Sequence, residues 1–512
     1  MSGPYRPPLP QPHPWPEPTS IQCHTEQLRR FTTLGPSSQT IFSECPPSTA
    51  LSVYSPSLSS DPHSALKRQL GLAAVVAVVV GDMLGSGVFF TPGELAAVAE
   101  APWQVYFFWG LCGMITLCGA LTLAELTSLL PRAGASYHII REGFGPFWAF
   151  LKIWIEMWVS GPGSVAGLAV VLGEFAVRLL GDESTVSATA WGALAIAAFA
   201  VINLLGIQWG GRAQIALTSI KLLGLLLLVG GSLLLTEAVA SPAGPAAASG
   251  ASLPGLVRLM GLGVAVVLFS YDGWVDVTHV AGEVSNPRRH LPLGLGLGVF
   301  GVTLLYLIVN HAYLRVVPLE AMRAAPNTVA ATVALAAFGP AGGQVLNVLM
   351  MVSILGALGG LVMTLPRLYY AAAAQYAEPT AVNRSTPFFR ALARVSSKGV
   401  PAGSVLFCAA LSIAALFLFG TFRRLVTFFV VPVHVVNILM VASVFRLRRR
   451  APPADGRFLT PGYPVVPVVY ILVLLLFLVS AVVYNPVDTL IGVAMTSTGI
   501  PVYLWMSRSP RA

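Results

Sequence analysis

The chain has 512 residues, of which 55% are hydrophobic and only 10% are charged, and its mean hydropathy is +0.75. Soluble domains usually carry about 25% charged residues, so the composition excludes an ordinary soluble protein. The formal net charge of +9 does not indicate a nucleic-acid partner, because the basic residues lie mainly at the ends of apolar segments, where membrane topology places them. The five cysteines have no spacing typical of a metal site or a disulfide framework.

Residues 1–65 differ from the rest of the chain, because they are rich in Pro and Ser. Such a composition does not bury enough apolar surface to fold, and it lacks the apolar core of a secretory signal peptide. We expect a disordered cytoplasmic tail here, followed by a membrane domain over residues 66–508.

Apolar segments of about 20 residues, the length that crosses a ~30 Å hydrocarbon layer, recur through this second part. They predict an all-α integral membrane protein of about twelve transmembrane helices. The predicted spans are 70–97, 103–130, 146–179, 188–206, 213–236, 256–283, 293–317, 343–370, 402–420, 424–445, 464–484 and 487–507.

The positions of Lys and Arg set the predicted orientation, since cytoplasmic loops carry the excess of these residues. With a cytoplasmic N-terminus, the inner segments hold most of them, and the outer loop at 181–187 contains Asp182 and Glu183 instead. The outer segments hold Arg315, Arg323, Arg423 and Arg424. This bias predicts a multi-pass protein of the cell membrane with an even number of spans and with both termini cytoplasmic.

The first predicted span, AVVAVVVGDMLGSGVFFTPGELA, contains Gly81, Gly85 and Gly87 in its middle. Glycine costs about 1 kcal/mol per helical site relative to alanine, so three glycines this close together favour local unwinding. Unwound backbone survives at membrane depth only where it lines a cavity inside the protein, and the N-terminus of the second half-helix suits a carboxylate. The alternative is a helix–helix contact through Gly81 and Gly85, which have Gly-x-x-x-Gly spacing.

The sixth predicted span places Ser270, Tyr271, Asp272 and Gly273 in the middle of the membrane. A charged residue at this depth marks a transport pathway or a buried partner. Interrupted helices in the first and sixth positions indicate a transporter site between inverted repeats. We therefore predict two five-helix repeats over residues 70–236 and 256–445, followed by two additional helices over 464–507.

Four segments resemble a known family. GDMLGSGVFFTPGELA is similar to the first-span signature of the amino acid–polyamine–organocation superfamily, and LTLAELTSLLPRAGASYHIIREGFGP is similar to its second-to-third-span segment. FSYDGWVDVTHVAGEVSNPRRHLP resembles the sixth span of the L-type amino acid transporter branch and its bacterial relatives, and MVSILGALGGLVMTLPRLYYA resembles the eighth span. The motifs occur in the family's order across most of residues 66–508. The resemblance implies a permease of five-plus-five inverted repeats.

The resemblance also implies roles for the residues at the two breaks. In that family the substrate α-carboxylate rests on the first-span break, which corresponds here to Gly85, Ser86 and Gly87. Backbone carbonyls hold the α-amino group, and they fall here on Leu84, Phe269 and Asp272. Ser270 and Tyr271 complete the expected substrate site. Phe269 corresponds to an aromatic residue that closes the site as a thin gate, although its residue type alone indicates helix packing. No cofactor is implied.

Lys221, in QIALTSIKLLGLLL, is the only lysine of the fifth predicted span. A buried lysine needs a partner or loses its proton. In sodium-independent members of the family, a lysine at this place occupies the position of a sodium ion and bridges the first and eighth spans. The match implies that sodium is not the coupling ion. The alternative is a lysine that snorkels to the membrane surface, although long apolar runs on both sides argue against it.

Asp82 departs from the family pattern, which often has a small or uncharged residue at this position. We expect Asp82 to pair with Lys221 or to take part in proton coupling. Asp276 lies one helical turn after Asp272, and it either faces the cavity or is a structural partner of His279.

Other polar residues of the spans receive weaker predictions. Glu283 closes the sixth span and is expected to be a structural or inner-gate element. Lys152 and Glu156 have the spacing of a simple i,i+4 pair. Tyr306 and Asn310 of the seventh span could reach the cavity.

The leading hypothesis is sodium-independent exchange or uptake of neutral amino acids by alternating access, with the apolar Phe269 and Ala357 favouring a neutral substrate. Proton-coupled symport of an amino acid or of a polyamine is the closest alternative. An enzyme is not expected, because no His-Glu-x-x-His or Gly-x-Ser-x-Gly motif occurs. A receptor with an odd number of spans contradicts the charge bias, whereas a channel with broken helices stays a rival.

The expected partners are the amino acid substrate and the lipid bilayer, without nucleic acid. In animal heteromeric members of the family, a cysteine between the third and fourth spans links a partner glycoprotein. The corresponding loop here, GDESTVSATAW, contains no cysteine, so a disulfide-linked heavy chain is not expected.

Overall fold

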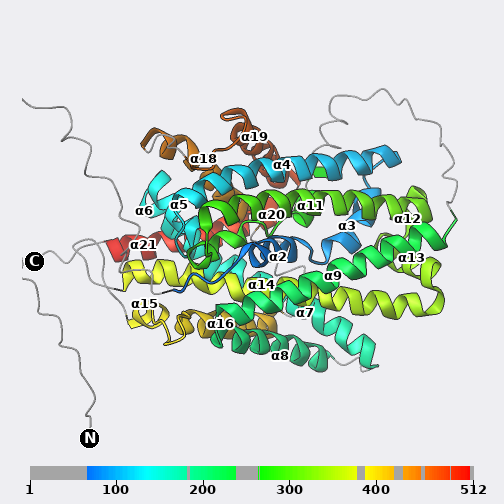
Figure 1. Ribbon diagram of the computed structural model, residues 1–512, viewed down its shortest axis with the longest axis horizontal. Helices are drawn as coiled ribbons and strands as arrows, with labels where there is room; N and C mark the ends of the chain where they lie inside the picture. Colours follow the sequence, from blue (N-terminus) through cyan, green and yellow to red (C-terminus); the bar gives the residue numbers. More distant parts are fainter. Residues whose placement is uncertain are drawn as a thin grey trace, which may run out of the picture. The chain divides into compact units, whose positions relative to one another are not determined.

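Helices make up the regular structure of the computed structural model, which describes residues 66–181, 185–237, 263–264, 266–377, 387–419, 430–450, 456–484 and 486–507 (Figure 1). Within these ranges the nearest approach to a sheet is a single bridge between Leu70 and Val284. The predicted tail over 1–65 lies outside them, and so do the first residues of the sixth predicted span, 256–262.

Ten helices of the described ranges are long and apolar enough to cross a membrane: Leu72–Ala96, Pro102–Leu129, Pro146–Leu180, Ser187–Leu204, Ile207–Leu235, Pro287–Val316, Val329–Tyr376, Val431–Arg450, Val465–Val483 and Thr489–Ser507. Ala402–Leu418 is a shorter apolar helix. Together they cover every predicted span except the sixth, whose described part is a short helical segment, a turn and a 3-10 helix. The predicted all-α membrane fold is confirmed, and the chain is a multi-pass membrane protein.

The helices are divided by breaks and short turns more finely than the spans. In chain order they are α2 (Leu72–Met83), α3 (Gly87–Ala96), α4 (Pro102–Leu129), α5 (Ala135–Phe144), α6 (Pro146–Ile155), the π-helical turn η1 (Glu156–Ser160), α7 (Gly161–Leu180), α8 (Thr185–Leu204), α9 (Ile207–Leu235), the 3-10 helix η2 (Asp276–Glu283), α11 (Pro287–Val316), α12 (Leu319–Ala324), η3 (Pro326–Thr328), α13 (Val329–Phe338), η4 (Gly339–Ala341), α14 (Gly342–Tyr376), α15 (Pro387–Leu392), α16 (Ala402–Phe419), α18 (Val430–Arg450), α19 (Val465–Tyr484), α20 (Pro486–Ser497) and α21 (Gly499–Ser507).

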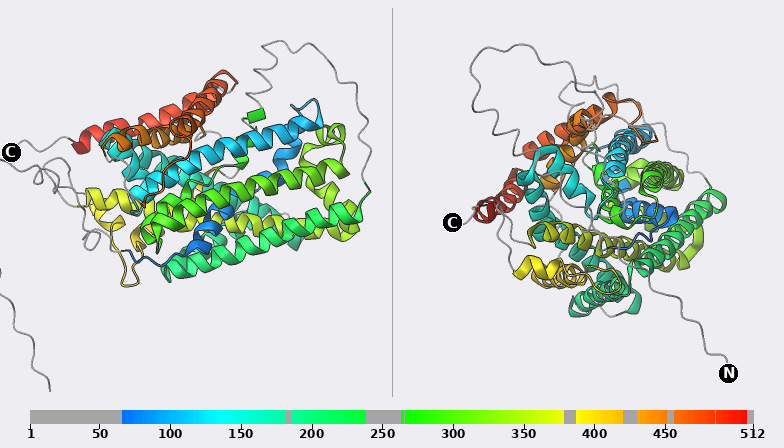
Figure 2. Two further views of the ribbon diagram at one scale, coloured as in Figure 1. Left: turned by 45° about the horizontal axis from the view of Figure 1, so that its top comes forward. Right: turned by 60° about the vertical axis from the view of Figure 1, so that its left-hand side comes forward.

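Prolines begin several of these helices, because a proline lacks the amide hydrogen that the first helical turn would leave unpaired. α4 begins at Pro102, α6 at Pro146 and α11 at Pro287. α4, α11 and α9 then run side by side along the bundle (Figure 2). The outer face of α9 exposes Leu223 and Leu227, as expected of side chains that face lipid.

Residues 318–342, between the seventh and eighth predicted spans, are largely helical. The segment forms α12, η3, α13 and η4; α12, η3 and α13 pack on α3, and α13 also packs on α9. The guanidinium of Arg323 donates to the carbonyl oxygens of Ala96 and Ala99 at 3.1 and 2.7 Å. A cation at the carbonyl end of a helix is favoured by the helix dipole, so Arg323 has a structural role at the end of α3.

A buried ion pair fixes the end of the sixth span to α14. Arg367 Nε donates to Glu283 Oε1 at 2.8 Å, and both side chains are fully buried. The backbone carbonyl of Glu283 accepts hydrogen bonds from the amides of Gln69 and Leu70 at 2.7 and 2.8 Å. The segment that precedes α2 is therefore held against the end of η2, in agreement with a structural role for Glu283.

Removing the cation of this pair should destabilise the protein strongly. In Arg367→Met the Glu283 carboxylate stays buried without its partner, which costs about 3–5 kcal/mol. We expect a clear fall in the apparent Tm of the protein in detergent, measured by size-exclusion chromatography after heating. Arg289→Met is the matched control, because Arg289 is exposed at the first turn of α11. Equal Tm values for the two variants would contradict the prediction.

Candidate functional site

The first span is broken where its sequence predicts. α2 ends at Met83, Leu84 leaves the helical conformation with φ −80° and ψ 68°, and α3 begins at Gly87. The last carbonyl groups of α2 are left without helical partners by such a break. Farther back in α2, two side chains of α9 donate to the carbonyl of Ala77: Thr218 Oγ1 at 3.0 Å and Gln214 Nε2 at 3.4 Å.

Lys221 binds the carbonyls at the break itself. Its fully buried ammonium group donates to the carbonyl oxygens of Gly81 and Leu84 at 2.8 and 2.9 Å, and to that of Ser353 on α14 at 3.0 Å. An ammonium group has three hydrogen-bond donors, and each has an acceptor here. Lys221 therefore joins α9 to both the first and the eighth span, as the resemblance implies, and it does not snorkel.

The sixth span is broken at the same level. Its helical backbone gives way to a turn over residues 271–275, and η2 follows. Gly273 has φ +100°, and a Cβ atom there would lie 2.7 Å from the carbonyl carbon of Asp82. Only glycine fits this close approach of two backbones. The two breaks are therefore in direct contact.

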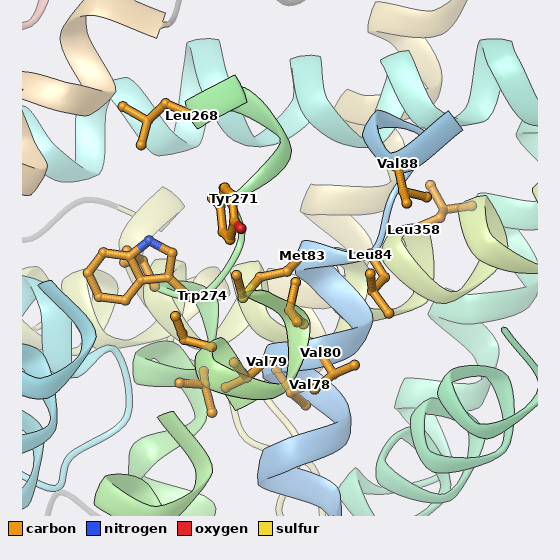
Figure 3. Packing of buried hydrophobic residues seen from close by; sticks show 14 of the residues in the cluster. Val78, Val79, Val80, Met83, Leu84, Val88, Leu268, Tyr271, Trp274 and Leu358 are labelled. Carbon is orange, nitrogen blue, oxygen red and sulfur yellow. The ribbon is translucent and has the colours of Figure 1, made fainter. Parts of the chain in front are cut away.

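Side chains behind the breaks hold them together. The hydroxyl of Tyr306 lies 2.8 Å from the carbonyl oxygens of both Met83 and Ser270, so its single hydrogen is shared between the two broken spans. Thr91 Oγ1 and Ser270 Oγ are 2.7 Å apart. Figure 3 shows Tyr271 and Trp274 of the sixth span beside Met83 of the first span.

A cavity of about 150 Å³ opens beside the two breaks, far more than the roughly 10–15 Å³ that one water needs. Its walls come from the first, third, sixth, eighth and tenth spans. The lining residues are Asp82, Met83, Gly85, Ser86, Gly87, Glu156, Ser160, Gly161, Ser164, Leu168, Phe269, Ser270, Asp272, Gly273, Val275, Asp276, Ala357, Leu361, Leu365, Val433 and Asn437. In the described ranges, no group of three His, Cys, Asp or Glu side chains is placed to hold a metal ion.

The cavity brings most of the expected site residues together. Gly85, Ser86, Gly87, Phe269, Ser270 and Asp272 all line it. Phe269 is 40% exposed although it lies at mid-span, so its ring borders open space instead of packing between helices. Asp276 lines the cavity as well, and its Oδ1 is 3.6 Å from Nδ1 of His279. Asp276 therefore both faces the cavity and lies beside His279.

Leu84 and Tyr271 lie outside the cavity walls. The carbonyl of Leu84 accepts from Lys221 and from the hydroxyl of Ser353, at 2.9 and 2.8 Å. The hydroxyl of Tyr271 donates to the carbonyl of Trp109 at 2.8 Å, and the residue is 1% exposed. In this conformation both residues stabilise the breaks from behind. Tyr306 and Asn310 are also buried behind them.

Asp82 does not form the ion pair with Lys221 that we expect from the sequence, because the three carbonyls occupy the ammonium group. Asp82 Oδ1 instead accepts from Gln214 Nε2 at 3.3 Å. Its other oxygen, Oδ2, is buried and has no hydrogen-bond partner among the described residues. The carboxylate packs directly against Gly360 of α14, where a Cβ atom would collide with Oδ1.

The sequence does not predict that the third span forms part of the cavity wall. Glu156, Ser160 and Ser164 line the cavity, and the π-helical turn η1 brings the first two there. Such turns occur frequently at functional sites. Glu156 does form the predicted pair with Lys152, at 2.5 Å, but Lys152 is buried and only 13% of the Glu156 side chain is exposed. A signal was present, because two charges inside an apolar span indicate a partner or a pathway.

The broken first and sixth spans and the cavity beside them define a transporter of the kind built from discontinuous helices. The family model for amino acid permeases matches residues 70–506. The chain therefore belongs to the amino acid permease family, and it is an amino acid transporter.

Curated relatives agree with this assignment. The chain is 28% identical over 452 residues to the serine/threonine exchanger SteT of Bacillus subtilis, which covers 86% of this chain and 98% of the exchanger. It is 26% identical to the human cystine/glutamate transporter, over 86% of this chain and 85% of that protein. It is 25% identical to the mouse Asc-type amino acid transporter 1, over 87% and 83%.

Crowding the Lys221 ammonium group should disable the site. A Cβ atom at Gly356 of α14 would lie 2.7 Å from Lys221 Nζ, so Gly356→Ala should displace the ammonium from its carbonyls. Each buried group left unpaired costs about 1–3 kcal/mol. We expect a lower apparent Tm and a fall of about 5- to 150-fold in amino acid uptake, since about 1.4 kcal/mol corresponds to a factor of ten.

Gly343→Ala is the matched control on the same helix, because a Cβ atom there meets no atom within 4 Å. Uptake by this variant should equal that of the unmodified protein. Normal uptake by Gly356→Ala would show that the position of Lys221 does not matter.

Proposed function

We propose that the chain exchanges or takes up neutral amino acids by alternating access, without sodium. The observation that carries the proposal is the ammonium group of Lys221, which binds carbonyl oxygens of both the first and the eighth span. Backbone carbonyls at unwound helices are the ligands that sodium-coupled transporters use for Na⁺. A fixed ammonium supplies the same charge to the same oxygens, so no soluble cation is needed there.

The first break offers a place for the substrate carboxylate. The first amides of α3 have no partner within the helix, and they carry the positive end of its dipole. A Cβ atom at Gly85 would meet nothing within 4 Å, so the backbone there is open to a ligand. We assign the α-carboxylate to Gly85, Ser86 and Gly87.

The α-amino group is assigned to the sixth-span side of the cavity. Carbonyl oxygens of Phe269 and Asp272 are the proposed acceptors, and the Leu84 carbonyl is left to Lys221 and Ser353 in this conformation. Phe269 is the proposed thin gate. A neutral side chain fits the wall formed by Phe269, Ala357 and Leu361, because these residues offer it no charged partner.

The remaining assignments follow from this function. The relatives are transporters, and we infer that this chain is not an enzyme. Both termini are proposed to be cytoplasmic in a cell membrane, as the distribution of Lys and Arg indicates. The outer loop after α7 contains no cysteine, which supports a transporter without a disulfide-linked heavy chain.

Purified protein in proteoliposomes tests the proposal. Vesicles loaded with one unlabelled amino acid should take up the same labelled amino acid faster than empty vesicles, in a screen of the standard amino acids. Replacing external Na⁺ by choline should leave the rate unchanged, because Lys221 already occupies the cation position. Uptake that requires Na⁺, or conduction of ions at channel rates, would contradict the proposal.

Lys221→Met should reduce uptake in the same assay by about tenfold, because the first break loses its ammonium donor and a buried group left unpaired costs about 1–3 kcal/mol. Lys398→Met is the control, since Lys398 is an exposed lysine outside the membrane spans. Unchanged uptake by Lys221→Met would remove the central observation.

A further inference from the structure

Three segments that are far apart in the sequence meet at one end of the bundle. α2 packs against both α9 and α11, and the chain before α2 lies beside the beginning of α9 (Figure 2). The amide of Ser285 donates to the carbonyl of Leu70 at 2.9 Å, and a Cβ atom at Gly211 would lie 3.0 Å from Leu70 Cδ2. The chain before α2 therefore contacts both the beginning of α9 and the segment that leads into α11.

Exposed cations lie within a few residues of these contacts. Every segment contributes: Lys67 and Arg68 before α2, Arg212 near the beginning of α9, and Arg288 in the first turn of α11. The cytoplasmic ends of membrane helices are generally basic, but that rule does not require basic residues of separate segments to converge. Converging like charges repel one another, so this place favours an anion.

The surrounding chain does not supply that anion. None of these cationic side chains has a hydrogen bond or an ion pair with another described residue, and the sequence contains no Asp or Glu in residues 66–81, 205–220 and 284–297. Other basic residues of the chain are used within it: the guanidinium of Arg448, for example, binds the carboxylate of Glu125 at 2.6 Å. The cations beside α2 are therefore available to a ligand.

An exposed tryptophan places this group at the membrane surface. Trp209 is 54% exposed, and Cζ of Arg212 lies 5.3 Å from the centre of its ring. Tryptophan is enriched where lipid tails meet headgroups, and an arginine over its face is held by a cation–π interaction. Farther along α9, Leu223 and Leu227 are exposed and suited to lipid tails. Arg212 is therefore held at the level of the headgroups.

We propose that this group of cations binds the phosphate of one anionic phospholipid. A guanidinium matches the oxygens of a phosphate with two parallel hydrogen bonds, and basic pockets between membrane helices bind anionic headgroups. Arg68, Arg212 and Arg288 supply one guanidinium from each segment, and the acyl chains lie along the exposed apolar face of α9. A phosphatidylcholine carries its own cation beside the phosphate, so it suits the site less than a phosphatidylglycerol does.

The bound lipid strengthens a contact that the protein already makes. The carbonyl of Leu70 accepts from both the amide and the hydroxyl of Ser285, at 2.9 and 3.1 Å, and the cations lie on both sides of this contact. A phosphate between them replaces their repulsion by attraction. A ligand that binds the folded state alone stabilises it. The lipid should therefore raise the stability of the protein, whatever the transported substrate is.

Purified full-length protein in dodecyl maltoside tests the inference. 1-Palmitoyl-2-oleoyl phosphatidylglycerol or the corresponding phosphatidylcholine is titrated into it, bound lipid is counted by native mass spectrometry, and the apparent Tm is measured by size-exclusion chromatography after heating. We expect tighter binding of the phosphatidylglycerol, and a rise in Tm with that lipid alone.

The combined variant Arg68→Gln, Arg212→Gln and Arg288→Gln should weaken phosphatidylglycerol binding about a hundredfold and lose the rise in Tm. The reason is that each basic residue near an anionic surface contributes a factor of about five. If this variant does not fold, Arg212→Gln alone should weaken binding about fivefold.

The matched control is the combined variant Arg390→Gln, Arg394→Gln and Lys398→Gln. It removes the same charge from exposed residues of α15 and the chain that follows it. Phosphatidylglycerol should bind this control as tightly as the unmodified protein and raise its Tm equally.

Three results would overturn the inference. Equal weakening in the two combined variants would show a general attraction between a basic protein and an acidic lipid. Equal binding of the two lipids would show that the headgroup charge does not matter. A rise in Tm of the same size with sodium phosphate alone would show a site for a free anion instead of a lipid.

Discussion

The contact on which the site depends is the ammonium group of Lys221 against the carbonyl oxygens of Gly81, Leu84 and Ser353. A break in a membrane helix leaves carbonyls without partners, and in a medium without water each of them costs several kcal/mol. Lys221 satisfies the carbonyls of the first break and ties them to α14. The unwound backbone at Gly85 and Ser86 can persist because this donor is present, and the cavity exists because the backbone is unwound.

The sequence reveals the breaks but not what the broken backbone contacts. Glycines at 81, 85 and 87 predict unwinding because their effect on a helix is local, and Gly273 acts in the same way in the sixth span. The direction in which the carbonyl of Leu84 points is not local. It is fixed by Lys221 and Ser353, which lie more than a hundred residues away along the chain, so no pattern around Leu84 predicts it.

The surroundings of a charged residue likewise depend on more than the local sequence. Lys152 and Glu156 have the spacing of an ordinary helical pair, and they do form one. Their spacing does not reveal that the π-helical turn η1 directs Glu156 into the cavity, where it meets Asp276 from the sixth span. Periodicity assigns a residue to a face of a regular helix, and a π turn changes that face. The division of the chain into two inverted repeats stays a prediction.

Arg323 links the end of the first span to the segment after α11. Its guanidinium joins α12 to the carbonyls of Ala96, the last residue of α3, and of Ala99 just beyond it, and the backbone at Pro326 is in close contact with Gly93 of the same half-helix. These contacts couple α3 to residues 319–328, so we expect the two to move together. Bending of the first span is then expected at Leu84–Ser86, the three residues between its two half-helices.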